Sequence, residues 1–172
     1  MQWKCCVCDE FERLIDAARA QVEDFVVTTD IIVGFPGETE QEWQQTLAFV
    51  ERIRFAHIHV FAFSPRQGTK AASLPATVDE ATKRARSRQL RDCAAGHKRE
   101  LLAEQIGRHF DMLVESTAGL DTDGQRVWTG YSPNYLKLEL RADPEQELGN
   151  QMLTVVAQAV DDKGECLIAS LA

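Results

Sequence analysis

The 172-residue sequence lacks the long apolar runs that mark membrane and secreted proteins. It has no stretch of about 18 apolar residues, the length that a membrane-spanning helix needs. Its first residues, MQWKCCVCDEF, contain no apolar leader core, so we expect no secretion signal. The composition, 44% apolar and 27% charged, is typical of a soluble globular protein. We therefore expect a cytoplasmic location and no membrane partner.

The sequence also lacks a cysteine pattern with an evident use. Five cysteines, an odd number in a chain without a secretion signal, do not predict a disulfide framework. The cluster of Cys5, Cys6 and Cys8 has the density of a metal site. However, a closed site needs four ligands in a tetrahedron, and adjacent Cys5 and Cys6 point in different directions. We interpret these cysteines as free thiols and predict no metal site.

Basic residues are in deficit, and the net charge of −8 is not that of a typical nucleic-acid-binding protein. Residues 1–76 carry 7 basic and 11 acidic side chains, residues 77–106 carry 7 and 5, and residues 107–172 carry 5 and 11. Only the middle segment is basic. The last segment, with a net charge of −6, would bind RNA only if the middle segment supplied the phosphate contacts.

The first half of the chain has the order helix, strand, helix, strand. A helix is expected over 9–22, capped by Asp9, followed by a strand at 24–34 buried on both faces. The capping box Thr39-x-x-Glu42 opens a helix to about Arg54, and 56–63 reads as a second buried strand. This order predicts a parallel strand pair with a helical crossover. Since two strands leave both sheet edges unpaired, the unit is expected to be part of a larger one.

A loop at 64–80 and a long helix follow. Thr77 and Glu80 have the spacing of a capping box, and the helix is expected to end near Gly107. Its basic face comprises Lys83, Arg84, Arg88 and Arg91, with Arg86 beside it.

After Gly107 the hydrophobic period changes from 3.6 to 2. Five short strands within about 65 residues predict a small β-barrel of OB-like size. The expected strands are HFDMLVES, QRVWTGY, NYLKLEL, MLTVVAQAV and CLIASL.

The loop Gly34-Phe35-Pro36-Gly37-Glu38 stands at the carboxyl end of the first strand, where parallel sheets bind ligands. Its glycines permit close backbone approach, and the helix N-terminus that follows favours an anionic group. It is neither a Walker loop nor a dinucleotide fingerprint. From these residues alone, a ligand loop and a plain turn remain equally open.

Two further stretches carry polar candidates. His57 and His59 share one face of the second strand; one buried and one edge histidine is favoured over a metal pair, because no third ligand is evident. Arg66, just beyond that strand, is placed to meet a phosphate or carboxylate.

In the β-module, GYSPNYLKLEL gathers aromatic, amide and cationic side chains, which single-stranded RNA recognition uses. They are Tyr131, Asn134, Tyr135 and Lys137. An ordinary hairpin with surface tyrosines is an equally open interpretation.

Taken together, these stretches resemble a known family. TTDIIVGFPGETEQEW followed by HVFAFSPRQGTKAA resembles the radical S-adenosylmethionine methylthiotransferases, with the Ser64–Thr69 turn as a specific part of the match. FDMLVES through GYSPNYLKLEL looks like the family's RNA-binding TRAM domain. The Gly-Tyr-Ser-x-Asn-Tyr form is similar to the branch that acts on threonylcarbamoyl-adenosine beside the tRNA anticodon.

The resemblance implies a fold of the α/β plus all-β class. Residues 1–76 would be the C-terminal part of a radical SAM (βα) partial barrel, 77–106 a connecting basic helix, and 107–172 a five-stranded TRAM barrel. The Gly34–Glu38 loop, with Phe63, would lie beside S-adenosylmethionine. The tRNA-facing residues would be Arg66, Tyr131, Asn134, Tyr135 and Lys137.

The resemblance also implies a reaction in which S-adenosylmethionine supplies a radical and a methyl group, and two 4Fe-4S clusters supply electrons and sulfur. The family's CxxxCxxC motif is not in this sequence. The cluster ligands would therefore lie outside this chain, in N-terminal domains of the same polypeptide, and no residue here is assigned a catalytic or metal role. We expect the chain alone to be inactive. Alternatives are a non-catalytic RNA-binding module, with tRNA as partner, and a decayed gene product.

Overall fold

The computed structural model describes residues 5–172, with side chains from residue 8 onward. The prediction for Cys5 and Cys6 thus falls outside the described side chains, whereas Cys8, Cys93 and Cys166 are free thiols. Contacts divide the chain into two compact units that meet inside one helix, between His97 and Lys98.

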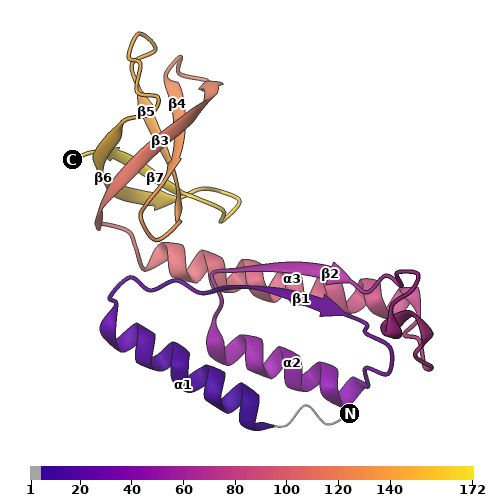
Figure 1. Cartoon of the computed structure of the whole chain (residues 1–172). Helices are drawn as coiled ribbons and strands as arrows, with labels where there is room; N and C mark the ends of the chain where they lie inside the picture. The colour runs from indigo at the N-terminus through magenta and orange to yellow at the C-terminus, as the bar shows by residue number, and fades with distance from the viewer. Residues whose placement is uncertain (1–4) are drawn as a thin grey trace. The chain divides into compact units, whose positions relative to one another are not determined.

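From residue 5 onward, the first unit contains three helices and two strands (Figure 1). They are α1 (Cys5–Gln21), β1 (Thr28–Val33), α2 (Glu40–Ile53), β2 (His57–Ala62), the short 3-10 turn η1 (Lys70–Ser73) and α3 (Glu80–Ala103), which continues into the second unit. Helix α1 begins earlier than predicted, so Asp9 lies inside it and is not its cap.

The two strands form the predicted parallel pair, in register from Thr28 opposite His57 to Val33 opposite Ala62. Helix α2 connects them and begins at the predicted capping box, in which Thr39 and Glu42 bond each other's backbone. Its buried positions are the predicted ones: Trp43, Leu47, Val50 and Ile53.

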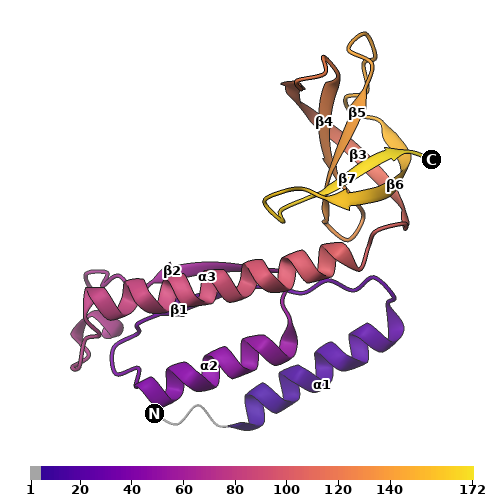
Figure 2. The ribbon, with the colours of Figure 1, turned by 180° about the vertical axis from the view of Figure 1, so that it is seen from behind.

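One face of this sheet is exposed, which corrects the prediction of strands buried on both faces. The other face, with Ile31, Val33, Ile58 and Val60, packs into one apolar core with residues of α1, α2 and α3. In both views α1 runs beside α2 (Figure 1 and Figure 2). The prediction failed because apolar side chains also occupy the exposed face, which bears Thr28, Asp30, Ile32, His57, His59 and Phe61.

The start of α3 also differs from the prediction. Asp79, not Thr77, caps the helix: its carboxylate accepts the backbone N–H groups of Ala81 and Thr82, both at 2.9 Å, and the Thr82 hydroxyl. These bonds, first that of the Thr82 hydroxyl, lower the pKa of Asp79. Asp79 is thus an anion held at a helix N-terminus, where the helix dipole favours it.

The second unit is a closed barrel with the order β3-β4-β5-β7-β6, which confirms the predicted five-stranded barrel. Its strands are β3 (His109–Leu120), β4 (Arg126–Tyr131), β5 (Lys137–Ala142), β6 (Met152–Val160) and β7 (Leu167–Leu171). Neighbouring strands are antiparallel except β5 and β7, which pair in parallel to close the barrel. Alternate residues, such as Met112, Leu138 and Leu167, fill the interior.

Over the described part of the chain, no helix has the length and apolarity to cross a membrane.

Candidate functional site

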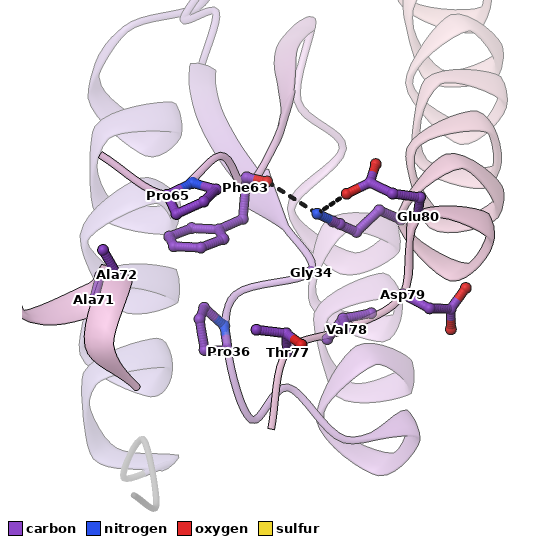
Figure 3. A pocket seen from close by; sticks show the side chains of 11 residues that line it. Gly34, Pro36, Phe63, Pro65, Ala71, Ala72, Thr77, Val78, Asp79 and Glu80 are labelled. Carbon is purple, nitrogen blue, oxygen red and sulfur yellow. Dashed lines mark hydrogen bonds and ion pairs between the residues drawn. The ribbon is translucent and has the colours of Figure 1, made fainter. Parts of the chain in front are cut away.

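A pocket of about 370 Å³ lies in the first unit, where the carboxyl ends of β1 and β2 meet the start of α3 (Figure 3). A mainly apolar wall with a few polar groups, at this volume, is typical of a small-molecule site. The lining residues are Gly34, Pro36, Phe63, Pro65, Ala71, Ala72, Thr77, Val78, Asp79, Glu80 and Lys83.

Gly34 is required by close packing against α3. Its φ of +72° lies in the left-handed region, and an added Cβ would stand 2.2 Å from Cγ of Lys83. The space that a side chain would fill is occupied by the lysine stem. Gly34 and Lys83 therefore form one wall of the pocket together.

Lys83 connects that wall to the end of β2. It is only 7% exposed, its ammonium donates to the Phe63 carbonyl at 3.2 Å, and it pairs with the Glu80 carboxylate. The prediction that Lys83 belongs to an exposed basic face is therefore wrong. Arg84, Arg88 and Arg91 are exposed as predicted.

The Gly34–Glu38 loop is held by an ion pair between the buried Arg86 and the half-buried Glu38. Glu38 accepts the Gly34 N–H at 2.8 Å and a bond from the Arg86 guanidinium at 2.6 Å. Arg86 also bonds Glu40 at 3.0 Å and lies over the Trp43 ring. Arg86 is buried in the first unit, so the prediction that it lies beside the basic face of the helix is wrong.

The same contacts overturn the expectation of an anion at the α2 N-terminus. The Thr39 and Glu42 side chains accept two of its backbone N–H groups, one from each other's residue. The carboxylates of Glu38, Glu40 and Glu42 outnumber the single Arg86 guanidinium there, so that end is negative. The Thr39 backbone N–H, and after it the Thr39 hydroxyl, donates to the Glu42 carboxylate. These hydrogen bonds lower the pKa of Glu42 and keep it ionised. A negatively charged ligand group would be repelled there.

In the barrel, Tyr131 and Lys137 face each other as the last pair of β4 and β5. The buried Ser132 hydroxyl organises the loop between them: it donates to Asn134 Oδ1 at 2.5 Å and accepts the Leu136 N–H at 3.0 Å. Asn134 therefore shapes this loop. The loop presents Tyr135, 83% exposed and with φ of +63°, to solvent.

No family model matches the chain, but curated proteins do. A ribosomal protein uS12 methylthiotransferase RimO from a Synechococcus species is 44% identical over 107 residues, 62% of this chain and 23% of that protein. A tRNA-2-methylthio-N(6)-dimethylallyladenosine synthase from Thermoanaerobacter is 39% identical over 115 residues, which are 67% of this chain and 24% of that protein. A threonylcarbamoyladenosine tRNA methylthiotransferase MtaB from Thermotoga maritima is 38% identical over 130 residues, which are 76% of this chain and 29% of that protein.

The chain is homologous to the C-terminal part of methylthiotransferases. It spans about a quarter of the length of the curated relatives it matches. This confirms the resemblance drawn from the sequence motifs, at the level of the enzyme class.

In this methylthiotransferase homologue, the predicted cofactor residues divide into two groups. Gly34, Pro36 and Phe63 line the pocket, and Phe35 packs edge-on against Phe63 with ring centroids 5.2 Å apart. Gly37 and Glu38 do not line it. The Gly37 N–H donates to the Ala76 carbonyl, and the Glu38 carboxylate accepts the Gly34 N–H, which holds the loop closed.

The remaining predicted residues lie elsewhere. Arg66 is exposed in the turn after β2, where its carbonyl accepts two bonds from Thr69. His57 and His59 are both exposed, with ring centroids 4.4 Å apart, so the expectation of one buried histidine is wrong. Both point from the open face because they stand two residues apart on one strand.

The described residues do not suit an iron–sulfur cluster. No group of three or more metal-binding side chains occurs among them. Burial raises the pKa of Cys93, and it raises that of Cys166 to about 12, so neither is a thiolate at neutral pH.

Sequence reasoning missed Lys83 and the segment Thr77–Glu80 as pocket residues. A signal for Lys83 was present: counting back from Leu90 at helical spacing gives 87 and 83 on the inward face. No local signal marks Thr77–Glu80, because only the folded chain brings α3 to the strand ends.

Proposed function

We propose that this chain is the C-terminal portion of a methylthiotransferase that adds a methylthio group to C2 of threonylcarbamoyl-adenosine in tRNA. The homology to methylthiotransferases carries the proposal. The proposed location is cytoplasmic, and the chain alone is inactive, because the cluster ligands belong to other parts of the polypeptide.

The threonylcarbamoyl branch is favoured by two observations. Among the three relatives described above, the alignment with the Thermotoga maritima protein covers the largest share of this chain, 76%. The Gly130–Tyr135 motif of that branch also forms the organised, tyrosine-presenting loop of the barrel.

The pocket suits the adenosyl group of S-adenosylmethionine. Its volume of about 370 Å³ falls in the range for small ligands, and Phe63 and Pro36 offer apolar surface to a purine. Once bound, S-adenosylmethionine would supply the radical and the methyl group. In the proposal, Gly34, Pro36 and Phe63 hold it, while Phe35, Gly37 and Glu38 fix the loop around it.

The decisive experiment is mass spectrometry of tRNA nucleosides from cells that lack the gene region encoding this chain. We expect the methylthio group to disappear from threonylcarbamoyl-adenosine alone and to return with the intact gene. Loss from dimethylallyladenosine, or from ribosomal protein uS12, would assign the protein to one of the other branches. Unchanged tRNA and uS12 would refute a methylthiotransferase function.

A second candidate, an RNA-binding module without catalysis, is favoured by the exposed tyrosines on the closed barrel. It predicts tRNA binding by the purified chain that weakens as salt rises. Binding that appears only in a longer polypeptide would argue against it.

A further inference from the structure

The barrel surface carries a row of side chains that runs across four strands. Met152 of β6 pairs with Leu113 of β3, Leu113 pairs with Tyr131 of β4, and Tyr131 pairs with Lys137 of β5. Directly opposed residues in antiparallel strands share one face of the sheet. We call these four residues the outer row.

The outer row faces solvent. On either side of Leu113, Met112 and Val114 are fully buried in the barrel, so Leu113 points outward. Met152 is 61% exposed, and Leu113 and Tyr131 are also exposed. Leu113, Met152 and the Tyr131 ring thus form a continuous strip across three paired strands.

Acidic residues border this strip on both sides. On β3, Asp111 stands two residues before Leu113 and accepts a bond from Thr154 at 3.2 Å. On β5, Glu139 stands two residues after Lys137, opposite Thr129. Phosphate groups are repelled from these borders, and Lys137 at the end of the row is the group that attracts one.

Two tyrosine side chains, which can stack on a base, stand near Lys137 at the β4–β5 end of the row. The chain has only two tyrosines, Tyr131 and Tyr135, and both are exposed on this side of the barrel. Tyr135 has a left-handed conformation that a bulky residue rarely adopts, and its N–H donates to the Ser132 carbonyl at 2.9 Å, so the turn holds it in place.

We infer that the outer row is a base-binding strip for single-stranded RNA, in which an unpaired base lies against Tyr131, Leu113 and Met152 while Lys137 contacts the adjoining phosphate. This rests on the proposed function, since it assumes that the barrel holds tRNA. The flat apolar strip accepts the face of a base, and the acidic borders keep the backbone at the Lys137 end. Leu113 and Met152 lie outside the sequence motif and extend the RNA surface beyond it.

The test uses the whole 172-residue chain and a fluorescently labelled anticodon stem-loop RNA. Fluorescence anisotropy gives Kd as a function of salt for wild type, Leu113→Ser, Met152→Ser and Lys137→Gln. Leu120→Ser is the matched control, because Leu120 is 63% exposed on the same barrel but outside the row.

We expect each apolar variant to weaken binding about fivefold or more with an unchanged salt slope, because no phosphate contact is lost. Lys137→Gln is expected to lower the salt slope by about 1. Leu120→Ser binds like wild type. Circular dichroism confirms that each variant is folded, and crosslinks from 4-thiouridine RNA, mapped by mass spectrometry, locate the base independently of any variant.

The inference is overturned if the row variants bind RNA as tightly as the control and the crosslinks lie elsewhere. If the same variants instead lose self-association in sedimentation, the strip is a protein contact. If wild type binds no RNA, the inference fails, while the nucleoside profile still decides separately whether the protein is a methylthiotransferase.

Discussion

At the scale of single residues, the pocket depends on a few side chains that lock the strand ends to α3. Gly34 leaves room for the Lys83 stem, and Lys83 holds the Phe63 carbonyl. Arg86 neutralises Glu38, which in turn fixes the Gly34 N–H. The contacts of Lys83 and Arg86 join residues 20 and 48 positions apart, whereas Glu38 and Gly34 are four apart within one loop. The two long-range contacts therefore affect stability as well as the shape of the pocket.

Gly34→Ala is predicted to destabilise the first unit by about 2–4 kcal/mol, from left-handed strain plus overlap with Lys83. Gly37→Ala is the matched control, because its φ is +87° but nothing lies within 4 Å of the added Cβ, so it costs only about 1–2 kcal/mol. Urea unfolding followed by helical circular dichroism measures both. Equal losses would show that the contact with Lys83 is unimportant.

Arg86→Met is predicted to cost about 3 kcal/mol, because it leaves the Glu38 carboxylate, only 15% exposed, without its cation. Arg84→Met, at the neighbouring exposed position, should change stability by less than about 0.5 kcal/mol. In the double variant Glu38→Gln, Arg86→Met, part of the loss should return, since no unpaired charge remains. A double variant no more stable than Arg86→Met would contradict the ion-pair explanation.

At the scale of elements, helix caps give the fold a pH dependence. Bonds from the Thr82 side chain and the Thr82 and Ala81 backbone hold the pKa of Asp79 below its ordinary 3.8. A carboxyl with a lowered pKa in the folded state stabilises fully above 3.8, and this stabilisation is lost as pH falls through the folded value.

Between pH 5 and pH 3, the Tm of the wild type should therefore fall further than that of Asp79→Asn. Asparagine still accepts the backbone bonds at the cap but does not titrate. Glu40 and Glu42, whose pKa values are also lowered, contribute equally to both proteins. Parallel curves over this range would exclude Asp79 as a source of the pH dependence.

At the scale of the whole molecule, the open face of the β1–β2 sheet exposes apolar surface. Ile32 and Phe61 pair across the strands and are 55% and 52% exposed. Contiguous exposed apolar groups beside unpaired strand edges favour association.

Sedimentation velocity should therefore show concentration-dependent association of the isolated chain. The double variant Ile32→Thr, Phe61→Thr is expected to reduce it, with strand propensity kept by threonine. Leu14→Thr, at an exposed position of α1, serves as the control and should leave association unchanged. A monomer at all concentrations would contradict the prediction.

The sequence by itself determined the order of elements, the capping box of α2, the parallel strand pair and the five strands of the barrel. These follow from local periodicity and turn residues, which act over a few positions. Its motifs also indicated the methylthiotransferase class, which homology then confirmed.

Only the tertiary structure decided which sheet face is open, that Lys83 meets the Phe63 carbonyl and Arg86 meets Glu38, and that Leu113 and Met152 continue the surface begun by Tyr131. The physical reason is that strand register and helix packing join residues far apart in the sequence. Hydrophobic periodicity shows which residues share a face of a helix or strand. The element that packs against that face determines whether it is core, pocket or surface.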